Sequence, residues 1–328
     1  MIINIQSLLL CFFLVGLLSQ QGISQKTNPL EQAVELGTIA WYRNYDKAIE
    51  ISRQTNKPLL ILFQEVPGCA TCQNYGRNIL SYPLLVDAIE NEFIPLVIYN
   101  NKEGEDKKIL QKFNERSWNN PVIRIINPDE KELVKKLTGD YSLAAITTQI
   151  EFALLVFSGS IPIYIQLMSE EIVAEQTGLE KAYFKMSCFW SGESHLGKME
   201  GVINTTPGYM EGHEVVEVNY DPYLIDKSEL IEYAGLADCM SISDNKKFKT
   251  DKDEQYYLKK SKYRFLPLTK GQRTKINSAL KDGSDPEAYL SPRQLEWKNE
   301  LVDHNYHKYE VLYTLPIEEA WDLWKQNH

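Results

Sequence analysis

Residues 57–80 read KPLLILFQEVPGCATCQNYGRNIL, and they combine an apolar run, a turn and a pair of cysteines. The run is short and continuous, which favours a strand buried on both faces of a sheet. Pro67 and Gly68 then predict a turn, and a helix is expected to begin at or near Cys69. Since the cysteines are spaced C-x-x-C, Cys69 would lie at the helix N-terminus and Cys72 one turn inside.

This cysteine spacing suits thiol–disulfide exchange. Unpaired N–H groups and the helix dipole favour a thiolate at Cys69, while Cys72 can attack a mixed disulfide formed there. An inert disulfide is an alternative, and C-x-x-C is also half of a zinc site. No second C-x-x-C or histidine pair follows at metal-ligand spacing, so we expect no metal.

Helical and strand-like segments alternate around the motif. Helical spacing over residues 41–55 precedes it. Buried strands are predicted in FIPLVIYNN (93–101) and PVIRIIN (121–127), with a charged helix between them and a further strand in KELVKKL (131–137). This order predicts an α/β sheet with helices on its faces.

Residues 38–150 resemble the thioredoxin superfamily. The resemblance is carried by KPLLILF, by Cys69-Ala70-Thr71-Cys72, and by Asn120-Pro121 before a strand, where that family places a cis proline facing the disulfide. It implies Cys69 as nucleophile and Cys72 as resolving thiol. Pro67-Gly68 replace the family's tryptophan-containing approach, so the direction of electron flow stays open.

Composition limits the partners and the compartment. With 328 residues, 45 of them acidic and 35 basic, the chain is long enough for two domains and carries a net charge of -10, which disfavours nucleic acid. An apolar run from Leu8 to Leu18 predicts a secretory signal peptide and a periplasmic or secreted protein. Because no lysine or arginine precedes this run, an uncleaved anchor is the alternative.

The rest of the chain divides by its hydrophobic pattern. The stretch 143–168 is apolar, but Glu151, Gly159 and Pro162 interrupt it, which favours two helices with a break near Gly159 over a membrane span. The predicted organisation is a signal peptide (1–25), a thioredoxin-like domain (36–150), a helical linker (151–178), a second domain of mixed α and β (179–285) and a C-terminal helical extension (286–328).

A third cysteine lies in MSCFWSG, residues 186–192, between a predicted strand and a helix. A buried cysteine often packs as a small hydrophobe, so core filler is one interpretation. The other is a nucleophile: a thiolate at Cys188 can attack sulfur, and Phe189 and Trp190 can form an apolar slot for a substrate methyl group. Spacing alone leaves both open.

Residues 182–280 resemble peptide methionine sulfoxide reductase of the A type, which implies an α+β, ferredoxin-like fold for the second domain. The matching residues occur in the family's order: Cys188, Phe189, Trp190, Glu193, Gly201, Val202, Thr205, Thr206, Gly208, Tyr209, His213, Val215, Val216, Tyr220, Asp221, Pro222, Asp251, Gln255 and Tyr256.

The resemblance implies a role for each site residue. Cys188 would be the nucleophile, with Phe189 and Trp190 holding the methyl group; the groups that bond the sulfoxide oxygen or its water would be Tyr209, Asp251 and Tyr256. Attack would release methionine and leave a sulfenic acid on Cys188, which a second thiol resolves. Cys239 or the Cys69–Cys72 pair would supply this second thiol. No cofactor beyond a thiol reductant is implied.

The chain also departs from this family. Ser187 and Ser191 replace two glycines, and only MEG separates Tyr209 from His213, where the family carries a longer loop with a catalytic glutamate. We therefore expect the loop acid to be missing, with Glu193 or Glu211 as a substitute.

The leading hypothesis is an exported reductase of methionine-S-sulfoxide in proteins or peptides, fed by an upstream thiol–disulfide donor. Its oligomeric state stays open. The alternatives are a thiol–disulfide oxidoreductase whose second domain only binds clients, and a non-catalytic binding protein.

Overall fold

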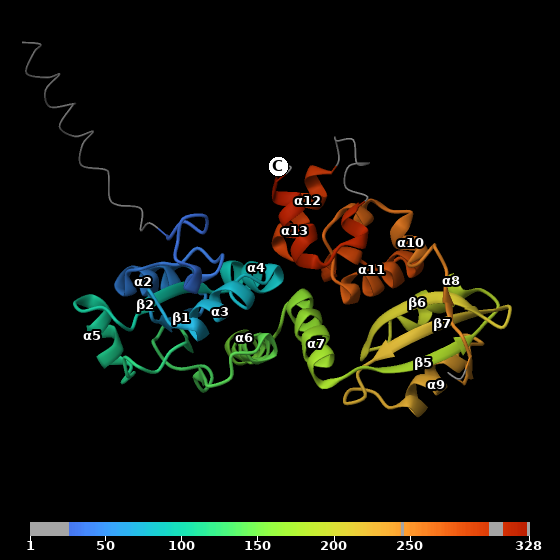
Figure 1. The fold of residues 1–328 in the computed structure, drawn as a ribbon, viewed down its shortest axis with the longest axis horizontal. Coiled ribbons are helices and arrows are strands. Elements are labelled where there is room, and N and C mark those ends of the chain that lie inside the picture. Colours follow the sequence, from blue (N-terminus) through green and yellow to red (C-terminus); the bar gives the residue numbers. More distant parts are fainter. Residues whose placement is uncertain (1–25, 244–245, 302–310, 327–328) are drawn as a thin grey trace, which may run out of the picture.

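The computed structural model describes residues 26–243, 246–301 and 311–326. Two sheets lie on either side of a layer of helices (Figure 1). The predicted signal peptide falls outside the described residues. The predicted fold class, two α/β domains with helices at the C-terminal end, is confirmed.

The first sheet has four strands in the order β2-β1-β3-β4, with β1 parallel to β2 and antiparallel to β3. In chain order this part consists of η1 (Val34–Leu36), α2 (Tyr45–Thr55), β1 (Leu59–Gln64), α3 (Ala70–Asn78), α4 (Pro83–Glu92), β2 (Ile94–Tyr99), α5 (Glu105–Lys112), β3 (Val122–Ile126), β4 (Leu137–Thr138) and α6 (Leu143–Ser158).

Both faces of β1 are buried, as its continuous apolar sequence predicts. Leu60 and Leu62 belong to the same core cluster as side chains of α3 and α4. Leu59, Ile61 and Phe63 pack on the other face, against α2 and α5. Because burial of each such side chain contributes about 1.5–3 kcal/mol, this strand is a firm base for the cysteine motif that follows it.

The second sheet has five antiparallel strands in the order β8-β5-β7-β6-β9. Its own core joins Phe184, Val216 and Val218 of the sheet to Phe189 of α8 and Leu230 of α9. In chain order this part consists of α7 (Ile163–Thr177), β5 (Glu180–Lys185), α8 (Phe189–Leu196), β6 (Val202–Met210), β7 (His213–Tyr220), α9 (Lys227–Gly235), β8 (Met240–Ile242), β9 (Lys249–Thr250), α10 (Tyr256–Lys259), η2 (Lys262–Phe265) and α11 (Lys270–Asp282).

Several helices begin at a side chain that accepts a hydrogen bond from the first turn, which explains where they start. Asn44 caps α2 and Ser142 caps α6. Asp226, Thr269 and Ser291 form capping boxes, in which an acidic or amide side chain three residues later bonds back to the cap. Such caps typically stabilise a helix by about 0.5–2 kcal/mol.

The C-terminal helices connect the two parts. They comprise η3 (Pro286–Tyr289), α12 (Pro292–Glu300) and α13 (Ile317–Gln326). Buried apolar side chains of these helices belong to one core cluster with those of α4, α6, α7 and α11. Trp297 and Trp321 meet edge to face at 4.5 Å between ring centroids, and Arg293 donates its backbone N–H to buried Asp87 of α4 at 3.1 Å. Helix α7 of the predicted linker and helices α12 and α13 of the predicted extension are therefore packed in one helical layer (Figure 1).

The predicted break in the apolar stretch 143–168 is confirmed. Gly159 ends α6 with a positive φ of 75°, a conformation that glycine adopts without strain, and α7 begins at Ile163. Across the described ranges, no helix combines the length and the apolar character needed to cross a membrane.

Other sequence predictions fail at the edges of the sheets. The strand predicted over 131–137 is wrong, because only Leu137–Thr138 pairs as β4, with a single bridge at Glu132. Lys136 instead pairs with buried Glu115, so the charged side chains of this segment hold it as an irregular edge. The prediction also missed α4 and β6, whose proline residues obscured the pattern.

The tryptophan contacts give a test of the helical layer. Trp297→Ala should lower the free energy of unfolding by about 3–5 kcal/mol, because it leaves a cavity beside Trp321 and Trp324. Trp118→Ala is the matched control, since that side chain is 71% exposed, and its effect should stay within about 0.5 kcal/mol. Urea unfolding followed by circular dichroism measures both. Equal effects of the two substitutions would contradict the packing.

Candidate functional site

Cys69 is the N-cap residue of α3, directly after the loop that leaves β1. Its side chain is exposed, whereas Cys72 in the first turn of α3 is buried. The two sulfur atoms are 3.6 Å apart, as free thiols. A hydrogen bond from the backbone N–H of Cys72 lowers the pKa of the Cys69 thiol, and burial raises the pKa of Cys72 to about 12. The pair thus combines an accessible, easily ionised thiol with a protected one, which suits thiol exchange.

The loop before α3 is held from two sides. Buried Glu35 accepts a hydrogen bond from the N–H of Gly68 at 2.7 Å. A Cβ atom at Gly68 would lie 2.4 Å from the carbonyl oxygen of Glu65 and 2.7 Å from the Cβ of Cys72, so only glycine fits. The Asn120–Pro121 bond is cis, as the resemblance implies, and the Cys72 thiol donates to the Asn120 side chain at 2.7 Å.

Cys188 is the N-cap residue of α8 and follows β5 after two residues. It is partly exposed and lies in a cavity of about 290 Å³. The lining residues are Ser187, Cys188, Phe189, Trp190, Tyr209, Glu214, Asp251 and Asp253. Most of the residues predicted for this site therefore meet around one cavity.

Aromatic side chains form the apolar wall of this cavity. Phe189 meets Trp190 and Tyr209 edge to face, at centroid distances of 5.5 and 5.4 Å. Trp190 stacks on Tyr256 at 4.3 Å. Tyr256 is not among the residues that line this cavity, but it lines a neighbouring hollow together with Asp253, which lines both. The wall suits a small apolar group such as a methyl.

Glu214 is the carboxylate that touches the start of α8. Its Oε2 accepts the backbone N–H of Phe189 at 2.8 Å, one of the donors that a helix N-terminus leaves unpaired. Asp251 and Asp253 line the same cavity. Desolvation, with the charges of Asp251 and Glu214, raises the pKa of Tyr209. A carboxyl group in this position can donate a proton to an oxygen that leaves a substrate at Cys188.

The two glutamates expected to replace a missing acid lie elsewhere. Glu193 is fully buried, accepts the backbone N–H of Gln255 at 2.9 Å, and has its pKa raised well above the ordinary value by burial. Glu211 is exposed, and its hydrogen-bonded pair with Lys246 at 2.8 Å lowers its pKa. Neither of them lines the cavity, whereas Glu214 of β7 does. Glu214 follows a residue used for the resemblance, so the signal was present in the sequence.

Cys239, the predicted resolving thiol, lies just before β8 and is buried. Its sulfur is 4.0 Å from the Sδ of Met186, and burial raises its pKa to about 11. Met186 also packs on α8, since a Cβ at Gly192 would lie only 1.7 Å from that Sδ. Cys239 is outside the lining of the Cys188 cavity, so a resolving role requires it to become exposed.

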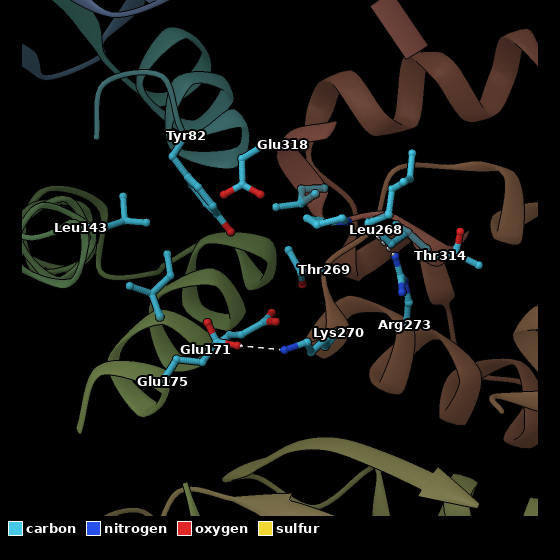
Figure 2. A pocket seen from close by; sticks show the side chains of 14 residues that line it. Tyr82, Leu143, Glu171, Glu175, Leu268, Thr269, Lys270, Arg273, Thr314 and Glu318 are labelled. Atoms are coloured by element: carbon cyan, nitrogen blue, oxygen red, sulfur yellow. Dashed lines mark hydrogen bonds and ion pairs between the residues drawn. The ribbon is translucent and has the colours of Figure 1, made fainter. Parts of the chain in front are cut away.

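A larger cavity, of about 480 Å³, lies between α7, α11 and the C-terminal segment (Figure 2). Glu171 in its wall accepts the N–H of Gly271 at 3.2 Å, and burial raises the pKa of this carboxyl to about 7. Lys270 pairs with Glu175 at 3.3 Å. Arg273 donates to the carbonyl of Leu315 at 3.2 Å. These groups join the helices, and none of the predicted site residues lines this cavity.

Comparison with known families matches two separate segments of the chain. A family model described as Thioredoxin-like matches residues 40–128, and one described as Peptide methionine sulfoxide reductase matches residues 180–232. The chain joins a thioredoxin-like domain to a peptide methionine sulfoxide reductase-like domain. Cys69 and Cys72 lie in the first matched range, and Cys188 and Glu214 lie in the second.

Three curated relatives resemble the reductase-like domain. Peptide methionine sulfoxide reductase MsrA 1 of Nostoc sp. (strain PCC 7120 / SAG 25.82 / UTEX 2576) is 33% identical over 81 residues, covering 20% of this chain and 50% of the relative. MsrA of Methanothermobacter thermautotrophicus is 37% identical over 70 residues, covering 16% of this chain and 41% of the relative. The Drosophila melanogaster peptide methionine sulfoxide reductase is 39% identical over 64 residues, covering 16% of this chain and 26% of the relative. The matched segments thus span half or less of each relative.

A solved structure titled DsbH Oxidoreductase is similar to the chain with a TM-score of 0.31 and 19% sequence identity. The match covers 40% of this chain and 91% of the chain in that structure.

The two thiols of the thioredoxin-like domain should differ in reactivity. At neutral pH iodoacetamide should modify Cys69 first, because its pKa is lowered and its side chain is exposed. Its rate should rise with pH around a midpoint below the ordinary thiol pKa of about 8.5. Timed quenching and peptide mass spectrometry measure each cysteine, with buried Cys239 as the slow reference. Modification of Cys72 as fast as Cys69 would contradict the assignment.

Substitution of Glu214 should lower the reaction rate at Cys188, and substitution of Glu211 should not. Glu214→Gln should lower the rate of sulfoxide reduction about 10²- to 10⁴-fold, the usual contribution of a general acid. Glu211→Gln is the matched control three residues away, because its carboxylate is exposed and paired with Lys246. Steady-state assays with a methionine sulfoxide peptide compare them. A normal rate in Glu214→Gln would remove this residue from the mechanism.

Proposed function

We propose that the reductase-like domain reduces methionine-S-sulfoxide in proteins or peptides, with Cys188 as the nucleophile. One observation carries the proposal: Cys188, an aromatic wall and the Glu214 carboxyl group surround the same cavity. A sulfoxide reductase needs these three features, namely a thiolate to attack sulfur, an acid for the departing oxygen and an apolar place for the methyl group. The likeness to peptide methionine sulfoxide reductases over residues 180–232 supports it independently.

The proposed reaction assigns one step to each of these groups. The Cys188 thiolate attacks the sulfoxide sulfur while its methyl group lies against Phe189 and Trp190. Glu214 protonates the oxygen, which is transferred to the Cys188 sulfur as the S–O bond to the substrate breaks. Methionine leaves, reduced by two electrons, and Cys188 is left as a sulfenic acid.

A thiol must then return Cys188 to its reduced form. Attack by a thiol on the sulfenic acid gives a disulfide and water, and a dithiol then reduces that disulfide by exchange. We propose that Cys239, the Cys69–Cys72 pair, or both in sequence supply these thiols. The low pKa and the exposure of Cys69 support its role in exchange. An upstream thiol–disulfide donor would then reduce Cys69 and Cys72 again.

We further propose that this cycle operates outside the cytoplasm, as the apolar run from Leu8 to Leu18 suggests. In that compartment a dithiol on the same chain would be valuable, because soluble reductants are scarce there.

A second function is supported by the same cysteine pair. The asymmetry between Cys69 and Cys72 fits a thiol–disulfide oxidoreductase whose second domain only binds client chains through the Phe189–Trp190 wall. The two functions differ in what they require of Cys188, since client binding needs no thiol there.

Substitution of Cys188 separates these functions. With dithiothreitol as reductant, the wild-type chain should reduce the S epimer of a methionine sulfoxide peptide, and Cys188→Ser should lose that activity. Insulin reduction by the Cys69–Cys72 pair should be unchanged in Cys188→Ser, which serves as the folding control. Chiral separation of the remaining peptide measures the epimer consumed. An inactive wild type that still reduces insulin would favour the client-binding function.

A further inference from the structure

The loop between β1 and α3 brings a third metal-ligating side chain to the cysteine pair. Glu65 is the first residue after β1, four residues before Cys69. A carboxylate oxygen of Glu65 and the sulfur atoms of Cys69 and Cys72 all lie within 4.8 Å of one another. Among the described residues, these three side chains form the group of histidine, cysteine, aspartate or glutamate ligands that lie close enough to share one metal ion.

The fold holds the loop backbone that carries Glu65 and leads to the two cysteines before any ion binds. Gly68 lets the loop turn back so closely that a Cβ there would collide with the Glu65 carbonyl oxygen and the Cys72 Cβ. Glu35 holds the N–H of Gly68 at 2.7 Å. Asn101 accepts the N–H of Val66 at 3.3 Å and donates to the Pro67 carbonyl at 3.3 Å. A loop fixed in this way loses little entropy when its side chains bind an ion.

The distances and donor atoms match zinc. Two sulfur ligands of a tetrahedral zinc ion, each at about 2.3 Å, are roughly 3.8 Å apart, and here the sulfur atoms are separated by 3.6 Å. Two thiolates and a carboxylate also form a donor set that zinc accepts readily. No ion pair or hydrogen bond engages the Glu65 side chain among the described residues, so its oxygens are available. Exposure of Cys69 leaves the fourth side open to solvent.

We propose that the reduced chain binds one zinc ion through Glu65, Cys69 and Cys72, with water as the fourth ligand. Zinc displaces the protons of both thiols and forms two Zn–S bonds and one Zn–O bond. Because each thiolate donates an electron pair to the positive ion, its nucleophilicity falls, and the bound ion slows attack by Cys69 on a disulfide. The thioredoxin-like domain is thus a zinc-inhibited exchange centre. Binding of the ion does not depend on the reaction at Cys188, whereas its inhibitory effect rests on the proposed exchange function of Cys69.

Zinc competition tests the ligand set. The reduced full-length chain is titrated with zinc against a chromophoric chelator under anaerobic conditions, and one tight site per chain is expected. Glu65→Gln should weaken binding at least about ten-fold, because it replaces the anionic carboxylate ligand with a neutral amide but keeps the side-chain shape. Glu50→Gln, an exposed glutamate of α2, is the matched control and should bind as the wild type does. Cys188→Ser should retain the site, and Cys72→Ser should lose it.

Alkylation tests the inhibition in the same samples. One equivalent of zinc should protect Cys69 of the wild type from iodoacetamide, and at the same zinc concentration Glu65→Gln should be modified several-fold faster. Equal zinc affinity of Glu65→Gln and Glu50→Gln would overturn the proposal, since the cysteines alone would then account for binding. A saturated wild type whose Cys69 reacts at the zinc-free rate would also overturn it.

Discussion

A cysteine at the N-cap of a helix, placed there by a strand just before it, is the constraint on which both halves of this protein depend. Cys69 follows β1 and begins α3, and Cys188 follows β5 and begins α8. The start of a helix leaves backbone N–H groups without partners, and these favour negative charge nearby. At α3 the Cys72 N–H stabilises a sulfur anion, whereas at α8 the Phe189 N–H holds the Glu214 carboxylate. The same local structure thus prepares thiol exchange in one domain and positions an acid in the other.

The helical layer limits direct contact between the Cys69 site and the Cys188 site. Side chains of α4, α6, α7 and the C-terminal helices share one buried core, and the Arg293–Asp87 contact ties α12 to the thioredoxin-like domain. Helices α3 and α8 lie on opposite sides of this layer (Figure 1). Direct exchange between Cys69 and Cys188 therefore requires a second copy of the chain or a rearrangement of the helical layer. A shared chain raises the local concentration of a donor only where its geometry lets both sites meet.

The sequence predicts those features that a short stretch determines by itself. The run at residues 59–63 is apolar throughout, which favours a buried strand, and Cys69 at a helix start follows from the turn after it. What it could not predict depends on partners far along the chain. Arg293 meets Asp87 across 206 residues, and Tyr256 of α10 stacks on Trp190 of α8. Glu214 was overlooked because the acid was sought in a loop instead of on β7.

The central claim, that the chain carries the electrons for sulfoxide reduction beyond one turnover, is tested most directly by counting methionine. The fully reduced chain, freed of external thiol, is mixed anaerobically with excess methionine-S-sulfoxide peptide, and the methionine formed per chain is measured. Cys188 alone yields one, because it stops as a sulfenic acid or a disulfide. If the Cys69–Cys72 pair returns Cys188 to its thiol once, the wild type yields two and Cys69→Ser yields one. One methionine from both chains would contradict the account.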